Sequence, residues 1–452
     1  MFLTRRLLVL CDKTISILVE LISKNKENFG YLPKFDREED IQVVIEGLIE
    51  KLQDNDPYFH PHYVGHMSSY ASDLSLIGYL MASQINPNNH SYEGGRATTN
   101  MEVECINKIG SMIGWKHAKG HLTSSGTIAN LESLWLARES GATSVIVSTQ
   151  GHYSHKRNSS ILGMECIHVP TDKNGKMRIS CLEEALTGRE KAVVVATLGT
   201  TLFGAVDPLD EIVSLKVKYN FILHTDAAYG GYFKLIEYSL SPSVMRSFLS
   251  LAKSDSIVID PHKKGLQPFG CGSILINPAY KNIGEKYQHE SPYTYFDKAG
   301  ISLGKETLEC SRSGASAAAL WATMQFYTLE KEGVFSSKLK NSKLAADKFA
   351  QMVRRSELFE CISDHYDLDI VVFKISNNVE IKKKTLCLFE AMKTKGYFLA
   401  LASGTYKNTY FDNSFIRCTF MKSEHIDIID QLYLTLETTL AEIETIELNS
   451  TL

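Results

Sequence analysis

The sequence predicts an α/β fold, with a large domain built on a mostly parallel sheet and a smaller α+β domain at the C-terminal end. Three observations support this prediction. Between residues 144 and 223, short continuous apolar runs alternate with helical segments. Strands without polar alternation are buried on both faces, which is typical of a parallel sheet covered by helices. Near Gly333 the pattern changes to a long helix followed by alternating strands, and 452 residues are enough for two such domains.

The expected elements follow one another along the chain. The large domain is predicted to have strands at 144–147, 166–169, 192–197, 221–223, 257–259 and 273–276, and helices at 128–139, 155–162, 180–186 and 209–219. The small domain is predicted to have helices at 336–355 and 426–442 and strands at 368–374, 396–402 and 415–420. Two amphipathic helices are expected at 4–24 and 37–53. We therefore expect an N-terminal helical segment (1–56), a large domain (57–332) and a small domain (333–452).

Composition argues against several classes of function. The formal net charge of −4 gives no reason to expect a nucleic-acid partner. The nine cysteines form no C-x-x-C pair, which favours reduced thiols in a cytoplasmic protein over a zinc site or a disulfide framework. No apolar run approaches the roughly 18 residues that a membrane span requires. The apolar run after Arg6 is cut by Asp12 and Lys13, so we expect mature structure there and no signal peptide.

One candidate for chemistry is a lysine at a strand end. Asp260 and Pro261 end the predicted strand 257–259, because proline cannot donate to a sheet ladder. We interpret the next residues as a loop that presents His262 and Lys263. Partial desolvation at such a place lowers the pKa of a lysine, as a Schiff base with a carbonyl cofactor requires. For this stretch alone, a solvated surface lysine is the simpler explanation.

A carboxylate follows the preceding strand. Asp226 comes after the buried run 221–223, and small residues follow it, including Ala228. Small neighbours allow a carboxylate to approach a flat ring, where it can pair with the protonated nitrogen of a pyridine cofactor. The aspartate and lysine stretches together are far more specific than either is alone.

A third segment could bind an anion. Ser125, Gly126 and Thr127 stand where a loop is expected to turn into helix 128–139. A helix start offers unpaired backbone N–H groups and the positive end of the helix dipole, and small hydroxylated residues add donors. A Ser-Ser-Gly-Thr run is also, by itself, a common helix cap.

Two of these segments resemble a known family. Residues 224–230, His-Thr-Asp-Ala-Ala-Tyr-Gly, and 260–263, Asp-Pro-His-Lys, resemble the H-x-D-A-A-x-G and D/N-P-H-K motifs of group II pyridoxal-phosphate-dependent amino acid decarboxylases. The resemblance is closest to tyrosine decarboxylases and to archaeal-type tyrosine/aspartate decarboxylases. It implies the fold-type I architecture of aspartate aminotransferase, with pyridoxal 5'-phosphate bound covalently to Lys263. Lys264 departs from the family, which often has an apolar or aromatic residue there.

The resemblance also implies roles for other residues. The motif around residues 150–156 assigns to His152, and not to His155, the role of stacking on the cofactor ring and reaching the substrate carboxylate. Thr200 or Thr201 would lie near the ring hydroxyl or His152, and we assign Thr200. The order of the three segments makes residues 125–127 the phosphate site. The expected cofactor contacts are Ser125, Gly126, Thr127, His152, Thr200, Asp226, Ala228, Asp260, His262, Lys263, Ser313 and Gly314.

A loop tyrosine would return a proton to the substrate carbon after carbon dioxide leaves. Tyr293 and Tyr295 are both candidates in the aperiodic segment 290–304, and we favour Tyr293. Either tyrosine could equally anchor the loop.

Two segments early in the large domain are expected to contact substrate. The histidines between residues 60 and 66 are interrupted by proline and glycine and have no cysteine nearby, so we predict no metal site. The family has a comparable segment near its substrate pocket, which makes Tyr63 and His66 candidate substrate contacts. Asn88 lies in a loop that resembles the N-P-N segment of bacterial tyrosine decarboxylases, although a structural turn would explain most of that loop.

The N-P-N loop is expected to lead into a helix. Thr99 could cap this helix, and Glu102 stands at the capping-box position three residues later.

The N-terminal helices suggest a second subunit. Their apolar stripes need a surface to pack on, which could be the core of the same chain. The resemblance implies instead that they wrap a partner, in a homodimer with active sites at the interface. Ser313 and Gly314 would then supply phosphate contacts from the neighbouring subunit. In the small domain, Arg417 is a candidate partner for a carboxylate.

These expectations converge on decarboxylation of an L-amino acid to the amine and carbon dioxide. Tyrosine is the favoured substrate, and glutamate, aspartate and histidine are alternatives. Two other reactions share the cofactor: an aldehyde synthase would need the loop tyrosine replaced, and a carbon-carbon lyase on a phosphorylated amino alcohol would need more basic residues. A non-enzymatic interaction protein is disfavoured, because Lys263, Asp226 and His152 are all present.

Overall fold

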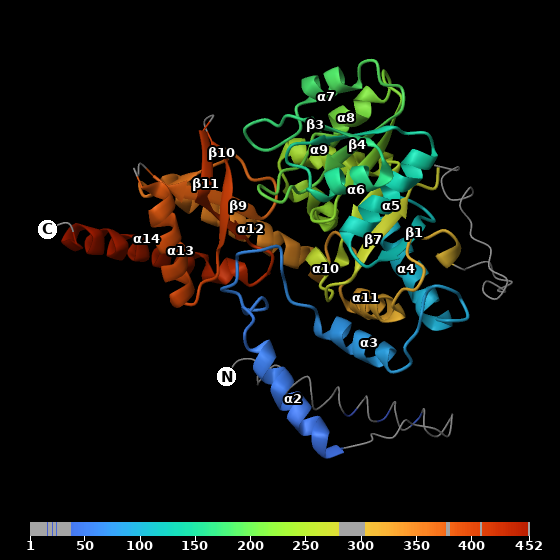
Figure 1. The fold of residues 1–452 in the computed structure, drawn as a ribbon, viewed down its shortest axis with the longest axis horizontal. Helices are drawn as coiled ribbons and strands as arrows, with labels where there is room; N and C mark the ends of the chain where they lie inside the picture. The colour runs from blue at the N-terminus through green and yellow to red at the C-terminus, as the bar shows by residue number, and fades with distance from the viewer. Residues whose placement is uncertain are drawn as a thin grey trace. The chain divides into compact units, whose positions relative to one another are not determined.

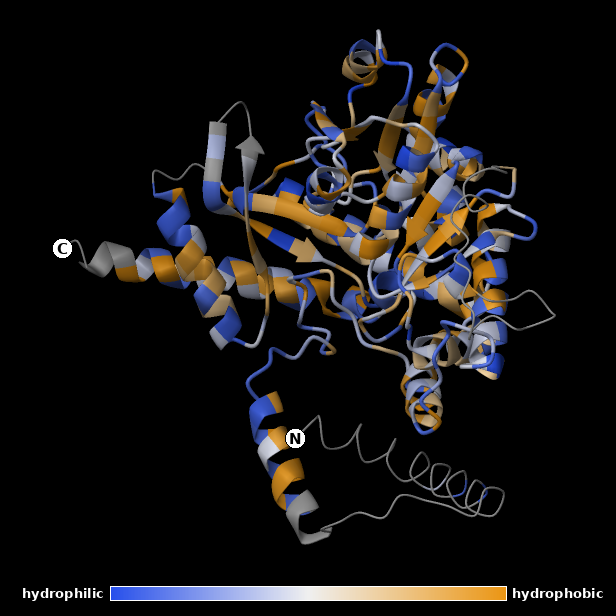
Figure 2. Cartoon of the chain, turned by 45° about the vertical axis from the view of Figure 1, so that its right-hand side comes forward, coloured by the Kyte–Doolittle hydropathy of each residue, from blue (hydrophilic) through white to orange (hydrophobic). Residues whose placement is uncertain are grey.

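The computed structural model describes residues 38–279, 303–376, 380–406 and 409–450, together with Ser16, Glu20 and Lys24. The chain divides into two compact units, residues 1–58 and 59–452. In the first unit, helix α2 spans Glu38–Leu52, close to the predicted range of 37–53. Figure 2 shows apolar residues along this helix, and several of them are exposed.

The second unit contains a seven-stranded sheet in the order β1-β7-β6-β5-β4-β2-β3 (Figure 1). The five strands from β6 to β3 are parallel neighbours, whereas β7 pairs antiparallel with both β6 and β1. The apolar runs form buried strands because both faces of the sheet are covered. The strands are β1 (Lys119–Thr123), β2 (Ser144–Ser148), β3 (Glu165–Val169), β4 (Ala192–Thr197), β5 (Phe221–Asp226), β6 (Ser256–Ile259) and β7 (Gly272–Ile276).

The four predicted helices of this domain are present between the strands, and a further helix at Pro242–Ser250 was not predicted. Those between the strands are α5 (Gly126–Glu139), α6 (Ser154–Leu162), α7 (Ile179–Leu186), α8 (Leu209–Leu215), α9 (Pro242–Ser250) and α10 (Pro261–Lys264). Helices α3 (Asp73–Ser83) and α4 (Arg96–Ile113) precede the sheet, and α11 (Gly314–Phe326) follows it. The mostly parallel sheet covered by helices confirms the predicted fold class.

The smaller C-terminal part has a four-stranded antiparallel sheet in the order β10-β11-β9-β8. Its core contains an aromatic cluster in which Phe349, Phe373 and Phe420 are fully buried. Figure 2 shows apolar residues along the strands and helices of this part. The elements are α12 (Val334–Arg355), β8 (Phe359–Cys361), β9 (Ile370–Ile375), α13 (Ile381–Thr394), β10 (Ala400–Tyr406), β11 (Thr409–Thr419) and α14 (His425–Ser450).

The predicted capping box at Thr99 is wrong. Helix α4 begins at Arg96, three residues earlier, with Gly95 as its N-cap and no side-chain cap. Glu102 is 1% exposed, and its carboxylate accepts hydrogen bonds from the backbone N of Leu122 and the side chain of Asn89 and pairs with Arg312. The carboxylate of Glu102, which the sequence pattern assigned to capping a helix, therefore belongs to a buried ion pair instead.

The segment after Asp260 also differs from the expected loop. Residues 261–264 form the single helical turn α10, with Pro261 at its first position. Proline favours this position because its fixed φ matches a helix and its missing N–H would have no partner there. Lys263 is therefore presented from a helical turn.

The carboxyl ends of three central strands meet at one edge of the large sheet. In β4 and β5, Thr197 pairs in register with Asp226, and β6 ends next to Asp260. Because parallel strands end together, residues from distant parts of the chain come into contact there. In the described ranges, no helix is long and apolar enough to cross a membrane.

Candidate active site

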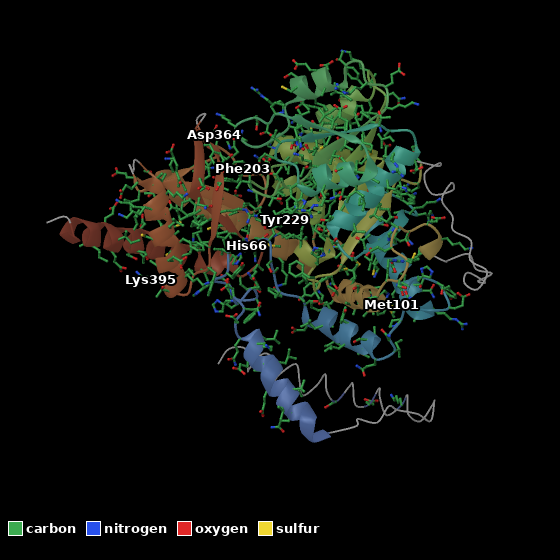
Figure 3. The ribbon with its side chains drawn as sticks, in the orientation of Figure 1. His66, Met101, Phe203, Tyr229, Asp364 and Lys395 are labelled. Carbon is green, nitrogen blue, oxygen red and sulfur yellow. The ribbon has the colours of Figure 1, made fainter. Side chains whose placement is uncertain are left out.

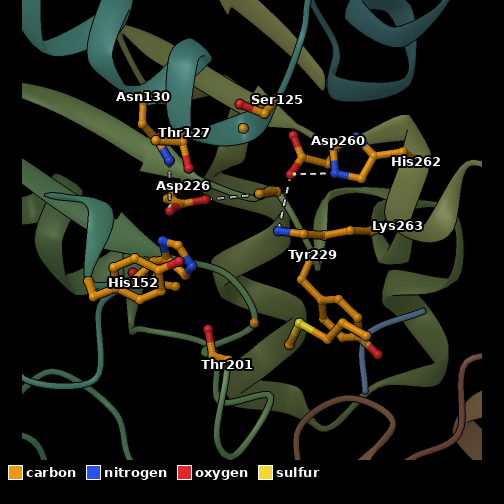
Figure 4. Close-up of a pocket in the computed structure, with 16 residues that line it drawn as sticks. Ser125, Thr127, Asn130, His152, Thr201, Asp226, Tyr229, Asp260, His262 and Lys263 are labelled. Carbon is orange, nitrogen blue, oxygen red and sulfur yellow. Dashed lines mark hydrogen bonds and ion pairs between the residues drawn. The ribbon is translucent and has the colours of Figure 1, made fainter. Parts of the chain in front are cut away.

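A pocket lies at this edge of the sheet (Figure 4). It contains the lysine, the carboxylate, the candidate phosphate loop and His152 that the sequence singled out from separate segments. The lining residues are Met67, Ser125, Gly126, Thr127, Asn130, His152, Tyr153, Thr197, Gly199, Thr201, Asp226, Ala228, Tyr229, Asp260, His262 and Lys263.

Asp226 is the last residue of β5 and is 5% exposed. Its Oδ2 accepts hydrogen bonds from His155 Nε2 at 2.8 Å and from Asn130 Nδ2 at 3.2 Å, and its Oδ1 accepts from the backbone N of Ala228 at 3.1 Å. Burial by itself would raise the pKa of this carboxyl group. The hydrogen bond and charge of His155, with a smaller contribution from Lys263, outweigh burial and hold the pKa below its usual value. Asp226 is therefore ionised at neutral pH.

A second layer of hydrogen bonds orients these partners. Asn130 Oδ1 lies 2.8 Å from His224 Nε2, so the Asn130 amide N–H₂ faces Asp226. Burial lowers the pKa of His224 to about 3, and this histidine is therefore neutral. His224 belongs to the same strand as Asp226, which explains why the two residues occur together in one motif.

Lys263 reaches the pocket from α10. Its Nζ lies 3.1 Å from Asp260 Oδ2, and its side chain is 22% exposed. The ring of His262 is fixed by a hydrogen bond between Nδ1 and the Cys271 carbonyl oxygen at 2.8 Å. Within the described part of the chain, the buried Oδ1 of Asp260 has no hydrogen-bond partner. The amine of Lys263, on α10, and the carboxylate of Asp226, at the end of β5, thus face the same space (Figure 4).

The candidate phosphate loop forms another side of the pocket. Ser125 is the N-cap of α5, and its hydroxyl accepts a hydrogen bond from the Ile128 N–H at 3.4 Å. Gly126 and Thr127 follow as the first residues of the helix. A Cβ atom at Gly126 would collide with the carboxylate of Asp260, so the close approach of helix and strand requires glycine there. The free N–H groups of this helix start are available to an anion.

His152 lines the pocket beside Tyr153. Its Nδ1 lies 2.7 Å from the Ser154 hydroxyl, which fixes the orientation of the ring. Burial, as the largest effect, lowers the pKa of His152, so the imidazole is neutral near pH 7. Its ring forms a flat wall, which the assigned stacking role requires.

These residues fit pyridoxal 5'-phosphate. The group needs an amine for its aldehyde, a carboxylate for its ring nitrogen, and donors for its phosphate. Lys263, Asp226 and the start of α5 supply these three functions around one cavity. Gly126 lets the start of α5 approach the carboxylate of Asp260 closely, which places the helix N–H groups at the edge of the cavity.

Thr200, the residue assigned to the cofactor, is buried and hydrogen-bonded within its own turn. Thr200 is 1% exposed and does not line the pocket, and its hydroxyl accepts a hydrogen bond from the Ala205 N–H at 3.0 Å. Thr201, the alternative, does line the pocket. Gly199 and Gly204, both with positive φ, turn the chain so that Thr200 faces inward and Thr201 faces the cavity.

The candidate substrate residues lie outside the lining of this pocket. Tyr63 is 2% exposed and packs on Phe398, and His66 is exposed. Met67, next to His66, lines the pocket instead. Asn88 contacts the segment of Ser313, because its side-chain oxygen accepts a hydrogen bond from the Arg312 N–H at 3.1 Å.

Other predicted residues are also elsewhere or outside the described ranges. Ser313 caps α11 and is exposed, and Gly314 is buried against the side chains of Asn89 and Thr98. Neither lines the pocket of its own chain. Tyr293 and Tyr295 lie outside the described residues. The described residues include no group of three or more His, Cys, Asp or Glu side chains that could hold a metal ion.

Sequence reasoning missed several residues of the site. His155 and Asn130 hold Asp226, and Met67 and Tyr229 line the pocket. A signal existed for Asn130, which follows Thr127 by three residues on the same side of helix α5. His155 could not have been chosen over other buried histidines, because its contact with Asp226 spans 71 positions.

Comparisons with known proteins agree with this geometry. The family described as "Pyridoxal-dependent decarboxylase conserved domain" matches residues 34–376, well over half of the chain. A probable L-tyrosine/L-aspartate decarboxylase of Methanosphaera stadtmanae is 28% identical over 387 residues, which cover 82% of this chain and 90% of that protein. An L-tyrosine decarboxylase of Levilactobacillus brevis is 27% identical, over 65% of this chain and 63% of the relative.

Solved structures share the fold. A structure of Oryza sativa TDC with PLP and tryptamine superposes with a TM-score of 0.78 at 18% identity, covering 98% of this chain and 97% of that one. A structure of mouse CSAD in apo form gives a TM-score of 0.77 at 20% identity, with 92% of each chain covered. At this level of identity, the likeness establishes the fold-type I architecture.

The family match, the fold and the pocket agree with one another. The cofactor is pyridoxal 5'-phosphate, and the reaction is the removal of the carboxyl group from an amino acid. The chain belongs to the family of pyridoxal-dependent decarboxylases.

Proposed function

We propose that this protein decarboxylates an aromatic L-amino acid, tyrosine foremost, to the corresponding amine. The observation that carries the proposal is that Lys263 and Asp226 line one pocket, which Met67 and Tyr229 also line. Apart from Lys263, the described lining residues include no lysine or arginine that could pair with an acidic side chain. The named activities of the Methanosphaera stadtmanae and Levilactobacillus brevis relatives support the same substrate.

Asp226 would help the cofactor ring to accept electrons. When bound, pyridoxal phosphate supplies a ring that accepts the electron pair of a breaking bond. Asp226, ionised and held by His155 and Asn130, would keep a proton on the ring nitrogen. The ionised state of this carboxylate is the contribution of the protein to that chemistry.

Lys263 and His152 would attach the cofactor and orient the substrate. Lys263 would hold the cofactor covalently and release it to the amine of the substrate, while Asp260 keeps the freed ammonium close at 3.1 Å. His152 would stack on the ring and hold the substrate carboxylate perpendicular to it, the orientation that favours loss of carbon dioxide over loss of the α-proton. Tyr293 would return the proton.

Arg417 is the proposed partner of a substrate carboxylate. It is 6% exposed, and its Nε and Nη1 donate hydrogen bonds to the carbonyl oxygens of Thr201 and Gly65 at 2.9 and 3.0 Å. Within the described residues, its buried Nη2 has no partner. The guanidinium lies beside Thr201, which lines the pocket, although Arg417 itself does not.

We also propose a cytoplasmic homodimer. The cysteines in the described ranges are all free. Helix α2 exposes Val44, Ile45, Leu48, Ile49 and Leu52, each at least 49% accessible. An amphipathic helix with such a stripe requires a covering surface. A second subunit would supply this surface, and would bring the adjoining segments of Asn88 and Ser313 to the interface.

A Lys263→Ala variant should lose the yellow absorbance of the covalently held cofactor, because no other amine of the pocket can bind the aldehyde. Amino acid decarboxylation should fall by about three orders of magnitude or more. Absorbance spectroscopy after addition of pyridoxal phosphate measures the first effect, and carbon dioxide release measures the second. Lys253→Ala, at an exposed position, is the control. Identical spectra for the two variants would show that the lysine is assigned wrongly.

A His155→Leu variant should bind pyridoxal phosphate about ten- to hundredfold more weakly, because a charge-assisted hydrogen bond to Asp226 contributes about 1.5–3 kcal/mol. His155 lowers the pKa of Asp226, so its loss raises that pKa. The acid side of the activity profile should therefore move to higher pH. Cofactor titration and a pH profile test this, with His155→Gln, which retains an N–H donor, as the matched variant. An unchanged pH profile in His155→Leu would contradict the role.

Tyrosine should give the highest kcat/KM in a panel with phenylalanine, aspartate, glutamate and histidine, by about tenfold or more over the acidic substrates. The reason is that the described lining residues offer a thioether and aromatic rings and, apart from Lys263, no lysine or arginine. Carbon dioxide release is the measurement, and D-tyrosine is the control. Faster turnover of aspartate would favour the second candidate, an acidic amino acid decarboxylase, which the tyrosine/aspartate relative also suggests.

Replacing Ile45 and Ile49 together by aspartate should convert the dimer to a monomer, since two charges on the stripe oppose its burial. Light scattering during size-exclusion chromatography measures the mass. Val43→Asp is the matched control, because Val43 is exposed but lies off the stripe. A wild-type protein that is already monomeric would refute the proposal.

A further inference from the structure

Lys264, the residue after the cofactor lysine, points away from the pocket and into the boundary between the two domains. Its side chain is 2% exposed and forms an ion pair with Asp369, whose side chain is fully buried. Asp369 directly precedes β9 of the small domain. The ion pair therefore joins the helical turn that carries Lys263 to the small sheet.

Asp369 also holds a residue of the pocket. Lys264 pairs with its Oδ2, and the Tyr229 hydroxyl donates a hydrogen bond to its Oδ1 at 2.6 Å. Tyr229 lines the pocket and is 2% exposed (Figures 3 and 4). The hydroxyl is thus committed to Asp369, so the tyrosine presents its ring to the cavity.

The small domain also contacts two other segments that line the pocket, next to Thr201 and Met67. Arg417, on strand β11 next to β9, donates to the carbonyl oxygens of Thr201 and Gly65. Thr201 lines the pocket, and Gly65 lies two residues before Met67, which also lines it. Three wall segments are therefore anchored to neighbouring strands of the small sheet, whereas Ser125, Asp226 and Lys263 are all carried by the large domain.

Stability alone does not explain the ion pair. Removing two charges from water is costly, and an apolar pair of similar volume is often as stable. The charged pair offers something an apolar pair lacks, which is a fixed acceptor for the Tyr229 hydroxyl. Both oxygens of Asp369 have partners, Oδ2 in Lys264 and Oδ1 in the Tyr229 hydroxyl.

We propose that Lys264 and Asp369 are positioning residues that hold the ring of Tyr229 as a fixed wall for the substrate, and so set substrate affinity but not cofactor binding. The proposal rests on the proposed function only in taking this pocket as the place where substrate binds. The proposal gives a role to Lys264, the residue at which this chain departs from the family pattern.

Two double variants separate positioning from stability. Lys264→Met/Asp369→Asn removes both charges but keeps an oxygen that accepts from Tyr229. Lys264→Met/Asp369→Leu removes the charges and the acceptor. The first should have a KM for the best amino acid substrate near that of the wild type, and the second a KM about three- to tenfold higher, the value of one hydrogen bond. The kcat should change little in either variant.

A third variant tests whether the effect passes through the tyrosine. Tyr229→Phe should raise KM by the same factor as the Leu-containing double variant, and combining the two should raise it no further, because both remove one contact. Titration of the apo proteins with pyridoxal phosphate should give equal dissociation constants for all variants. That readout does not depend on turnover.

Equal KM values for the two double variants would overturn the proposal. A weaker cofactor affinity that parallels the rise in KM would also overturn it, because the contact would then be structural. Failure of the proposed function is a distinct result: the wild-type protein would convert no amino acid in the panel.

Discussion

The structure depends on keeping one buried carboxylate charged. Asp226 is almost completely removed from water, a situation that normally drives a carboxyl group to its neutral form. His155, Asn130 and the backbone N–H of Ala228 reverse that tendency with three hydrogen bonds. A neutral acid in this place could not hold a proton on a ring nitrogen, and the pocket would lose its electron sink.

The arrangement of the sheet makes this contact possible. Asp226 ends β5, His155 lies in the helix after β2, and Asn130 lies in the helix that begins at the candidate phosphate loop. Their sequence positions are far apart, yet each follows or ends a strand of the same sheet. The carboxyl edge of a parallel sheet therefore brings an amine, an acid and an anion site together without long loops. The small domain contributes differently. Its Arg417 donates a hydrogen bond to Thr201, and its Asp369 accepts one from Tyr229.

Much of the fold and of the candidate site could be predicted from the sequence, because individual strands and the positions of strand ends follow from local residue patterns. Strand β4 was predicted at its observed bounds, since a buried run of β-branched residues has few other interpretations. Lys263, Asp226 and His152 were expected in one pocket because strand ends converge, and all three line it. Long-range pairing was beyond the reach of sequence patterns. Glu102 resembled a capping residue but pairs with Arg312, and the choice between Thr200 and Thr201 depended on a turn whose direction only the fold determines.

The most direct test of this account is the protonation state of the bound cofactor. Pyridoxal phosphate labelled at the pyridine nitrogen can be bound to the protein and observed by nitrogen NMR at neutral pH. The account predicts the chemical shift of a protonated ring nitrogen in the wild type, and the shift of a neutral nitrogen in Asp226→Asn. A neutral nitrogen in the wild-type protein would contradict it.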